Sequence, residues 1–82
     1  MSESDRPNKV HFHREELGLK KTELEAETKS IGTGVTARTI ATLERTGEVS
    51  DTTKRRVLNA LNRRRRVAGL TERLFAELYP KG

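Results

Sequence analysis

Apolar residues recur along this chain at helical spacings, and glycines separate one such run from the next. No segment alternates between apolar and polar residues in the sustained way that marks a half-buried strand. Glycine ends helices readily because it adopts the left-handed backbone conformation without steric cost. The pattern therefore predicts an all-α protein, a compact bundle of about five short helices.

Capping residues and helix breakers set the expected limits of these helices. The five helices are expected at about residues 8–17, 20–29, 36–45, 51–67 and 71–79. Thr22 and Glu25 have the spacing of a capping box in the second helix. Thr36 is a suitable N-cap for the third helix, and Val35 before it is placed to pack on Ile40.

The last helix and the N-terminal segment complete the expected organisation. Thr71 is expected to cap the last helix and Pro80 to end it. Its apolar side would hold Leu74, Phe75, Leu78 and Tyr79. We predict that residues 1–7 are disordered and that residues 8–82 form a single domain, with a C-terminal helix at about 71–79.

Size and composition argue against catalysis. Eighty-two residues bury one small core, which leaves no room for a large catalytic cleft. The chain has no cysteine, no serine stands beside a histidine, and His11 and His13 would diverge on a helix. We therefore expect no enzyme activity, no metal or other cofactor, and no small-molecule substrate.

Positive charge is unevenly distributed along the chain. Seventeen Lys and Arg residues against twelve Asp and Glu residues give a net charge of +5. The segment 54–66 holds seven basic residues and no acidic one. Clustered positive charge predicts a polyanionic partner, such as nucleic acid or an acidic protein. Since no apolar run has the length of a membrane span or a signal peptide, we expect a cytoplasmic protein without a membrane partner.

The third predicted helix carries the clearest candidate binding face. Arg38, Thr42 and Arg45 follow one another at steps of four and three, so they share the side opposite the apolar stripe. Thr39 and Thr46 flank this row. Arginine pairs bidentately with guanine in a major groove, and threonine can donate, accept or contact a thymine methyl group. The alternative is that the face is simply solvated.

Two segments of the chain together carry a family pattern. They read HREELGLKKTEL, at 13–24, and VTARTIATLERTG, at 35–47. The residues that match are Arg14 before two glutamates, Gly18, Leu19, Leu24, Gly34, Val35, Ile40, Leu43, Glu44 and Arg45, followed by the apolar VLNAL at 57–61. With these residues the chain resembles the lambda-repressor-like, Cro-type helix-turn-helix family, also called Xre-like. The resemblance covers about residues 10–61 and implies a helix-turn-helix within the bundle.

The resemblance also implies roles for individual residues. Those that would contact the DNA phosphate backbone are Lys20, Lys21, Thr46 and Lys54. Those on the helix that would read bases are Thr36, Ala37, Arg38, Thr39, Thr42 and Arg45. Arg14 and Glu44 match a pair that forms an internal salt bridge in this family.

Three features depart from the family pattern. Glu25 stands where relatives prefer a small residue, and Lys21 stands where glutamine is common. The segment KSIGTG lengthens the connection between the motif helices by roughly four or five residues, relative to a turn of about three to four. Gly32 and Gly34 would let this loop re-enter the third helix at the required angle. Alternatively, the glycines and Thr33 would hold a phosphate group, such as one of the DNA backbone.

Together these features predict a sequence-specific regulator of transcription that binds double-stranded DNA, a repressor of phage or mobile-element type. It would read the major groove with the helix at about 36–45 and act in the cytoplasm of a bacterium or a phage-infected host, on the nucleoid when bound. Arg63 and Arg64 are expected to add DNA contacts, and the C-terminal helix to serve the core or a homodimer. Two alternatives stay open: a protein-interaction or antitoxin-like module, and a non-specific nucleic-acid binder that uses Arg63–Arg66.

Overall fold

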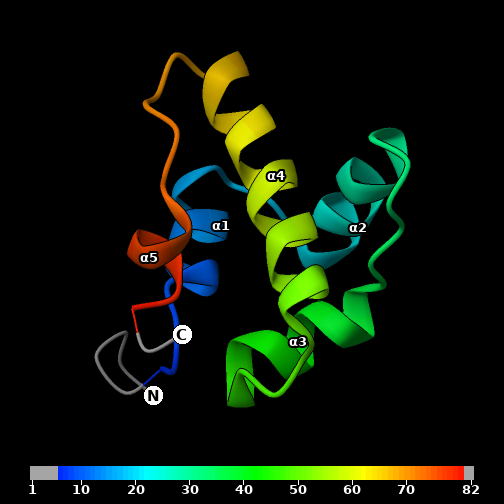
Figure 1. Ribbon diagram of the computed structural model, residues 1–82. Helices are drawn as coiled ribbons and strands as arrows, with labels where there is room; N and C mark the ends of the chain where they lie inside the picture. Colours follow the sequence, from blue (N-terminus) through cyan, green and yellow to red (C-terminus); the bar gives the residue numbers. More distant parts are fainter. Residues whose placement is uncertain (1–5, 81–82) are drawn as a thin grey trace.

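Five α-helices organise residues 6–80, the part of the chain that the computed structural model describes (Figure 1). They are α1 (Val10–Glu16), α2 (Lys21–Ser30), α3 (Ala37–Thr46), α4 (Asp51–Val67) and α5 (Phe75–Leu78). No strand occurs between residues 6 and 80, so the predicted all-α bundle is confirmed. The first four helices begin and end within two residues of their predicted limits, and only α5 is much shorter than predicted.

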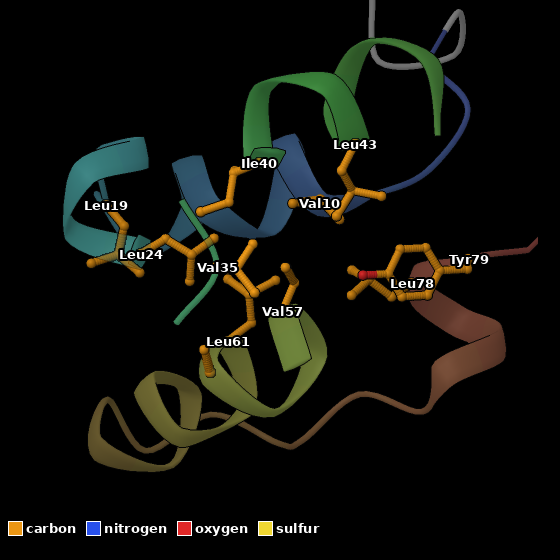
Figure 2. Close-up of a cluster of buried hydrophobic side chains, with 11 residues drawn as sticks. Val10, Leu19, Leu24, Val35, Ile40, Leu43, Val57, Leu61, Leu78 and Tyr79 are labelled. Carbon is orange, nitrogen blue, oxygen red and sulfur yellow. The ribbon is translucent and has the colours of Figure 1, made fainter. Parts of the chain in front are cut away.

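The long helix α4 organises the bundle. Figure 1 shows α5 on one side of α4 and α2 on the other, with α3 beside its first turn. The buried apolar side chains, most of which Figure 2 shows, come from all five helices and from the connections next to α2 and α3. They are Val10, Leu19, Leu24, Val35, Ile40, Leu43, Val57, Ala60, Leu61, Leu78 and Tyr79. Burying one large aliphatic side chain stabilises a fold by about 1.5–3 kcal/mol, so this cluster is the main source of stability.

Local capping signals define α3 and the start of α4. The hydroxyl of Thr36 accepts a hydrogen bond from the backbone N–H of Thr39 at 3.2 Å, and that of Ser50 accepts one from Thr53 at 3.1 Å. Gly47 ends α3 with a φ of 73°, in the left-handed region. Val35 and Ile40, the predicted hydrophobic pair, both belong to the buried cluster. The predicted N-cap of α3 is therefore confirmed, and Ser50 caps α4.

The N-terminus of α2 differs from prediction. Because the helix begins at Lys21, the third helical position is Glu23, and its carboxylate accepts the backbone N–H of Lys20 at 2.9 Å. The predicted capping box of Thr22 and Glu25 is therefore wrong. Glu25 lies two residues beyond this third helical position, and its carboxylate instead contacts α3.

The C-terminal segment also differs, because α5 covers four residues and the chain before it is not helical. The side-chain amide of Asn62 donates to the carbonyl of Arg73 at 2.9 Å and accepts the backbone N–H of Arg73 at 2.8 Å. Arg65 Nε donates to the carbonyl of Thr71 at 2.6 Å. These bonds attach residues 71–73 to α4, and residues 70–74 are not helical, so Thr71 does not cap a helix.

The apolar residues of α5 and its two flanking positions differ in how far they are buried. Leu78 and Tyr79 are buried in the bundle, and the Tyr79 hydroxyl donates to the carbonyl of Lys54 at 2.8 Å. Leu74, by contrast, is 70% exposed, and Phe75 is half-buried. The C-terminal helix therefore contributes Leu78 and Tyr79 to the core, while Leu74 and part of Phe75 remain exposed.

The segment before α1 packs against the end of α3. Of the predicted disordered segment 1–7, residues 1–5 lie outside the described residues, whereas Arg6 and Pro7 are half-buried. Asn8 is buried, donates from its amide to the carbonyl of Leu43 at 2.8 Å and accepts the backbone N–H of Val10 at 3.1 Å. Order thus begins earlier than predicted.

Candidate functional site

The outward side of α3 holds the predicted row of Arg38, Thr42 and Arg45. Both arginines are exposed and Thr42 between them is half-buried. Neither guanidinium forms an ion pair with a residue of the described range 6–80. Two positive charges therefore stand on one side of α3 without an internal partner, and we call this side the outer face of α3.

The remaining predicted residues of α3 surround this row. Thr36 and Thr46, at the two ends of the helix, are exposed, while Ala37 and Thr39 are half-buried. The Thr36 hydroxyl donates to the Thr39 hydroxyl at 3.0 Å. The Thr46 hydroxyl donates to the carbonyl of Thr42 at 3.0 Å and accepts the backbone N–H of Glu48 at 3.1 Å. The structure thus brings the six predicted base-reading residues and Thr46 together on α3 and its N-cap. Several of their hydroxyl groups form hydrogen bonds within the helix.

A buried ion pair fixes the opposite side of α3. Arg14 on α1 donates to Glu44 from Nε at 2.7 Å and from Nη2 at 3.1 Å, and its Nη1 donates to the carbonyl of Leu19 at 2.8 Å. Both side chains are almost fully buried. The hydrogen bonds to Glu44 raise the pKa of Arg14 above its ordinary value. The predicted pair is confirmed, and it ties the last turn of α3 to α1.

A second carboxylate holds the first turn of α3. The side chain of Glu25 accepts the backbone N–H of Ala37 at 2.9 Å and pairs with Lys29 at 2.9 Å. The hydrogen bond with Lys29, and then that with Ala37, lower the pKa of Glu25 below its ordinary value. A carboxylate at this position suits the positive end of the α3 dipole. Sequence reasoning missed this contact because its partners stand twelve residues apart across an irregular loop.

The connection between α2 and α3 is organised by Thr28, which sequence reasoning also missed. Its buried hydroxyl accepts the backbone N–H of Val35 at 2.8 Å and donates to the carbonyl of Glu25 at 2.6 Å. Its carbonyl accepts the N–H groups of Thr33 at 2.9 Å and Gly34 at 3.2 Å, and the Thr33 hydroxyl at 2.9 Å. One residue of α2 therefore holds most of the loop.

The length and backbone of this connection follow from that arrangement. It comprises six residues, 31–36, because α2 extends to Ser30. It thus exceeds a turn of about three to four residues by less than the predicted four or five. Gly32 and Gly34 have φ values of 84° and 53°, which other residues adopt only with strain, so the predicted need for glycine here is confirmed.

The donors of the predicted phosphate cradle in this loop are engaged within the molecule. The N–H and hydroxyl of Thr33 already bind the carbonyl of Thr28, and the N–H of Ala37 binds the Glu25 carboxylate. A carboxylate at this place also repels a second anion. Thr33 therefore has a structural role in the loop, and a phosphate contact by Thr33 stays a prediction.

The arginine run 63–66 is engaged within the molecule. Arg63 Nε and Arg64 Nη1 lie 3.2 and 3.6 Å from the Glu27 carboxylate on α2. Arg65 is buried, pairs with Glu16 and donates to the carbonyl of Thr71, while Arg66 lies 3.7 Å from Glu72. Each arginine of the run therefore has an acidic partner.

The same run is also far from α3. Figure 1 shows α3 beside the first turn of α4, whereas residues 63–66 form its opposite end. Twelve helical residues separate Asp51 from Arg63, which corresponds to about 18 Å along the axis. The structure therefore does not bring Arg63 and Arg64, which are predicted to add DNA contacts, together with the outer face of α3.

The predicted phosphate-contacting lysines differ in exposure. Lys20 and Lys21 are exposed at the start of α2. The Lys54 side chain is only 12% exposed, lies 4.0 Å from Asp51 and has its Nζ 5.7 Å from the centre of the Tyr79 ring. Lys54 therefore packs on α5, which leaves less of its charge available than predicted.

The connection from α3 to α4 carries charge of the opposite sign. Glu48 is exposed two residues after Thr46, and Asp51 is exposed where α4 begins. Asp51 in the first turn of α4 suits the helix dipole. Both carboxylates would repel a phosphate group, so this edge of the outer face of α3 is less favourable for a polyanion than the resemblance implied.

A buried histidine lies between α1 and α4, away from these residues. His13 is 4% exposed, with its Nδ1 3.4 Å from Glu16 and 3.5 Å from Arg65 Nη1. Burial lowers the pKa of His13 below 6.5, with Arg65 acting in the same direction and Glu16 opposing it. Within residues 6–80, no group of three His, Cys, Asp or Glu side chains is arranged to hold a metal ion.

Comparisons with known proteins do not identify a family for this chain. No protein-family model matches the chain, and neither curated proteins nor solved structures give a significant match. In the described part of the chain, no helix has the length and apolar character needed to cross a membrane. The function of the outer face of α3 must therefore be argued from its own chemistry.

Proposed function

We propose that this protein is a sequence-specific regulator that binds double-stranded DNA by placing α3 in the major groove. The observation that carries the proposal is the row of Arg38, Thr42 and Arg45 on a helix that is held at both ends. An α-helix fits the width of the major groove, and exposed guanidinium groups can pair with guanine edges there. Occupying an operator needs no catalytic group.

The anchoring of α3 supports this proposal. Glu25 holds its first turn to α2, and the pair of Arg14 and Glu44 holds its last turn to α1. Figure 1 shows α3 at one end of the bundle, and Arg38 and Arg45 on this helix are exposed. A rigidly held helix with an uncovered polar side loses little conformational freedom on binding, which favours selective recognition. We therefore assign α2, the six-residue connection and α3 to a helix-turn-helix.

Phosphate contacts are assigned first to Lys20 and Lys21 at the start of α2. Both are exposed and neither forms an ion pair within the described residues. Arg63 and Arg64 have a smaller role, because each would have to leave Glu27 to bind a phosphate. The non-specific alternative, which relied on the arginine run, is less well supported for the same reason.

A protein-interaction module is the second candidate, and exposed apolar side chains favour it. Phe12 on α1, Val67 at the end of α4, and Leu70 and Leu74 before α5 are between 38% and 79% exposed. None of them lies on α3. The two functions therefore involve different surfaces, and binding of a protein partner would not need Arg38 or Arg45.

Selection of bound sites from random duplex DNA, at a stated salt concentration, tests the proposed function. We expect enrichment of a short site that contains guanine, and its symmetry reports the stoichiometry. A palindromic consensus indicates a dimer, and an asymmetric one indicates a monomer. Absence of any enriched site at moderate salt would refute the DNA-binding proposal and leave the interaction module.

A further inference from the structure

We propose that Thr42 selects thymine through its methyl group and not through its hydroxyl. This inference rests on the proposed function, since it concerns what the outer face of α3 reads. A threonine side chain offers three recognition elements, which are one O–H donor, the oxygen lone pairs and the Cγ2 methyl group. The hydrogen bond that the Thr42 hydroxyl already forms limits which of these elements can contact a base.

The hydroxyl hydrogen of Thr42 is already used inside the helix. Its Oγ1 donates to the carbonyl of Arg38, one turn earlier, at 3.2 Å. A hydroxyl has a single hydrogen, so none is left for N7 of a purine, O6 of guanine or O4 of thymine, which are all acceptors. Turning the hydroxyl toward a base would break this bond. What remains available without rearrangement is the methyl group, together with the oxygen lone pairs, which can accept from adenine N6 or cytosine N4 but find no donor on thymine.

Thr46 repeats this arrangement one turn later. Its hydroxyl donates to the carbonyl of Thr42 at 3.0 Å and accepts the N–H of Glu48 at 3.1 Å. Successive threonines on this side of α3 therefore turn their hydroxyls back onto the helix. Of the two, Thr42 stands between the arginines and offers its methyl group there, and the apolar feature of a major groove is the C5-methyl group of thymine.

The flanking arginines define where that thymine lies. Thr42 stands four residues after Arg38 and three before Arg45, on the same side of α3. The two arginines are separated along the helix axis by about 10.5 Å. Successive base pairs rise about 3.4 Å, so this distance spans about three steps where the helix follows the groove. The geometry points to a half-site with guanine near each end and thymine between them.

Two near-isosteric variants separate the methyl group from the hydroxyl. Thr42→Val keeps the methyl group and removes the hydroxyl, whereas Thr42→Ser keeps the hydroxyl and removes the methyl group. The probes are the selected duplex and the same duplex with deoxyuridine in place of the central thymine, which removes only the C5-methyl group. Thr52→Ser, an exposed threonine on α4, is the matched control.

The wild-type protein and Thr42→Val should both prefer thymine over deoxyuridine by about fourfold, the effect of burying one methyl-sized group. Thr42→Ser should bind both duplexes equally, and Thr52→Ser should behave like wild type. Thermal melting of each variant checks that it is folded. If the wild-type protein binds both duplexes equally, or if Thr42→Ser keeps the preference, the Thr42 methyl group does not contact the thymine methyl group and the inference is overturned. Failure of the wild-type protein to select any duplex would instead overturn the proposed function.

Discussion

The carboxylate of Glu25 lies 2.9 Å from the backbone nitrogen of Ala37 and so joins the middle of α2 to the first turn of α3. Together with Thr28, which binds the N–H of Val35, it makes the position of α3 depend on α2 rather than on the loop between them. Gly32 and Gly34 allow the backbone conformation of the loop, but the side chains of Glu25 and Thr28 fix the position of its C-terminal end. This explains how an irregular six-residue connection can still hold a helix firmly.

Removing the Glu25 carboxylate should destabilise the fold. Glu25→Ala leaves the Ala37 N–H without its partner and removes a negative charge from the positive end of α3. Glu25→Gln keeps an acceptor and should cost less. Urea denaturation measures both as a lower midpoint, with Glu48→Gln, an exposed glutamate, as the control. An unchanged midpoint for Glu25→Ala would show that the contact contributes no stability.

Breaking the pair of Arg14 and Glu44 should cost more than removing it. Glu44→Ala leaves a buried guanidinium without its carboxylate, a change that typically costs about 3–5 kcal/mol. The double variant Arg14→Met/Glu44→Leu removes both charges and should be markedly more stable than Glu44→Ala. Chemical denaturation of the wild type, both single variants and the double variant tests this. Additive losses in the double variant would contradict the prediction.

Stability should fall in mildly acidic solution because of His13. Burial lowers its pKa in the folded protein below 6.5, so the unfolded chain binds a proton first as the pH falls. The contribution of neutral His13 is therefore complete above pH 6.5 and declines as the pH falls from there through the folded pKa. His13→Gln should reduce the difference between urea midpoints at pH 7.5 and 5.5, whereas His11→Gln should not. Equal pH dependence in all three proteins would exclude this role.

Arg38, near the start of α3, and Arg64, near the end of α4, should affect DNA binding differently. Arg38→Ala should lose about 1–3 kcal/mol on the selected site and relax selectivity at one position. Arg64→Ala should lose little, and equally on every sequence, because Arg64 is paired with Glu27. Binding titrations on the selected duplex and on an unrelated one, at the same salt concentration, measure both. Equal losses on both duplexes for both variants would favour non-specific binding.

Features that depend on neighbouring residues were predictable from the sequence. Thr36, Ser50 and Gly47 act within one turn of the helix ends that they define, so their residue types carry the signal. The apolar spacing likewise predicted that Ile40 and Leu43 are buried. The outward direction of Arg38 and Arg45 follows from the same spacing.

Features that depend on distant partners were not predictable in the same way. The residues before α5 were predicted to belong to the last helix. Hydrogen bonds from Asn62 and Arg65 attach this segment to α4 instead, and α5 is short as a result. The arginine run looked like a single basic patch, yet Glu27 and Glu16 reach it from other helices. Such pairings become visible only when the helices are placed relative to one another.

The row of Arg38, Thr42 and Arg45 lies outside the core and outside both attachments of α3. Exchanging these three side chains should therefore alter what the protein recognises while leaving its melting temperature almost unchanged. A scaffold of this kind can acquire a new target by a few surface substitutions, without any compensating change in its interior.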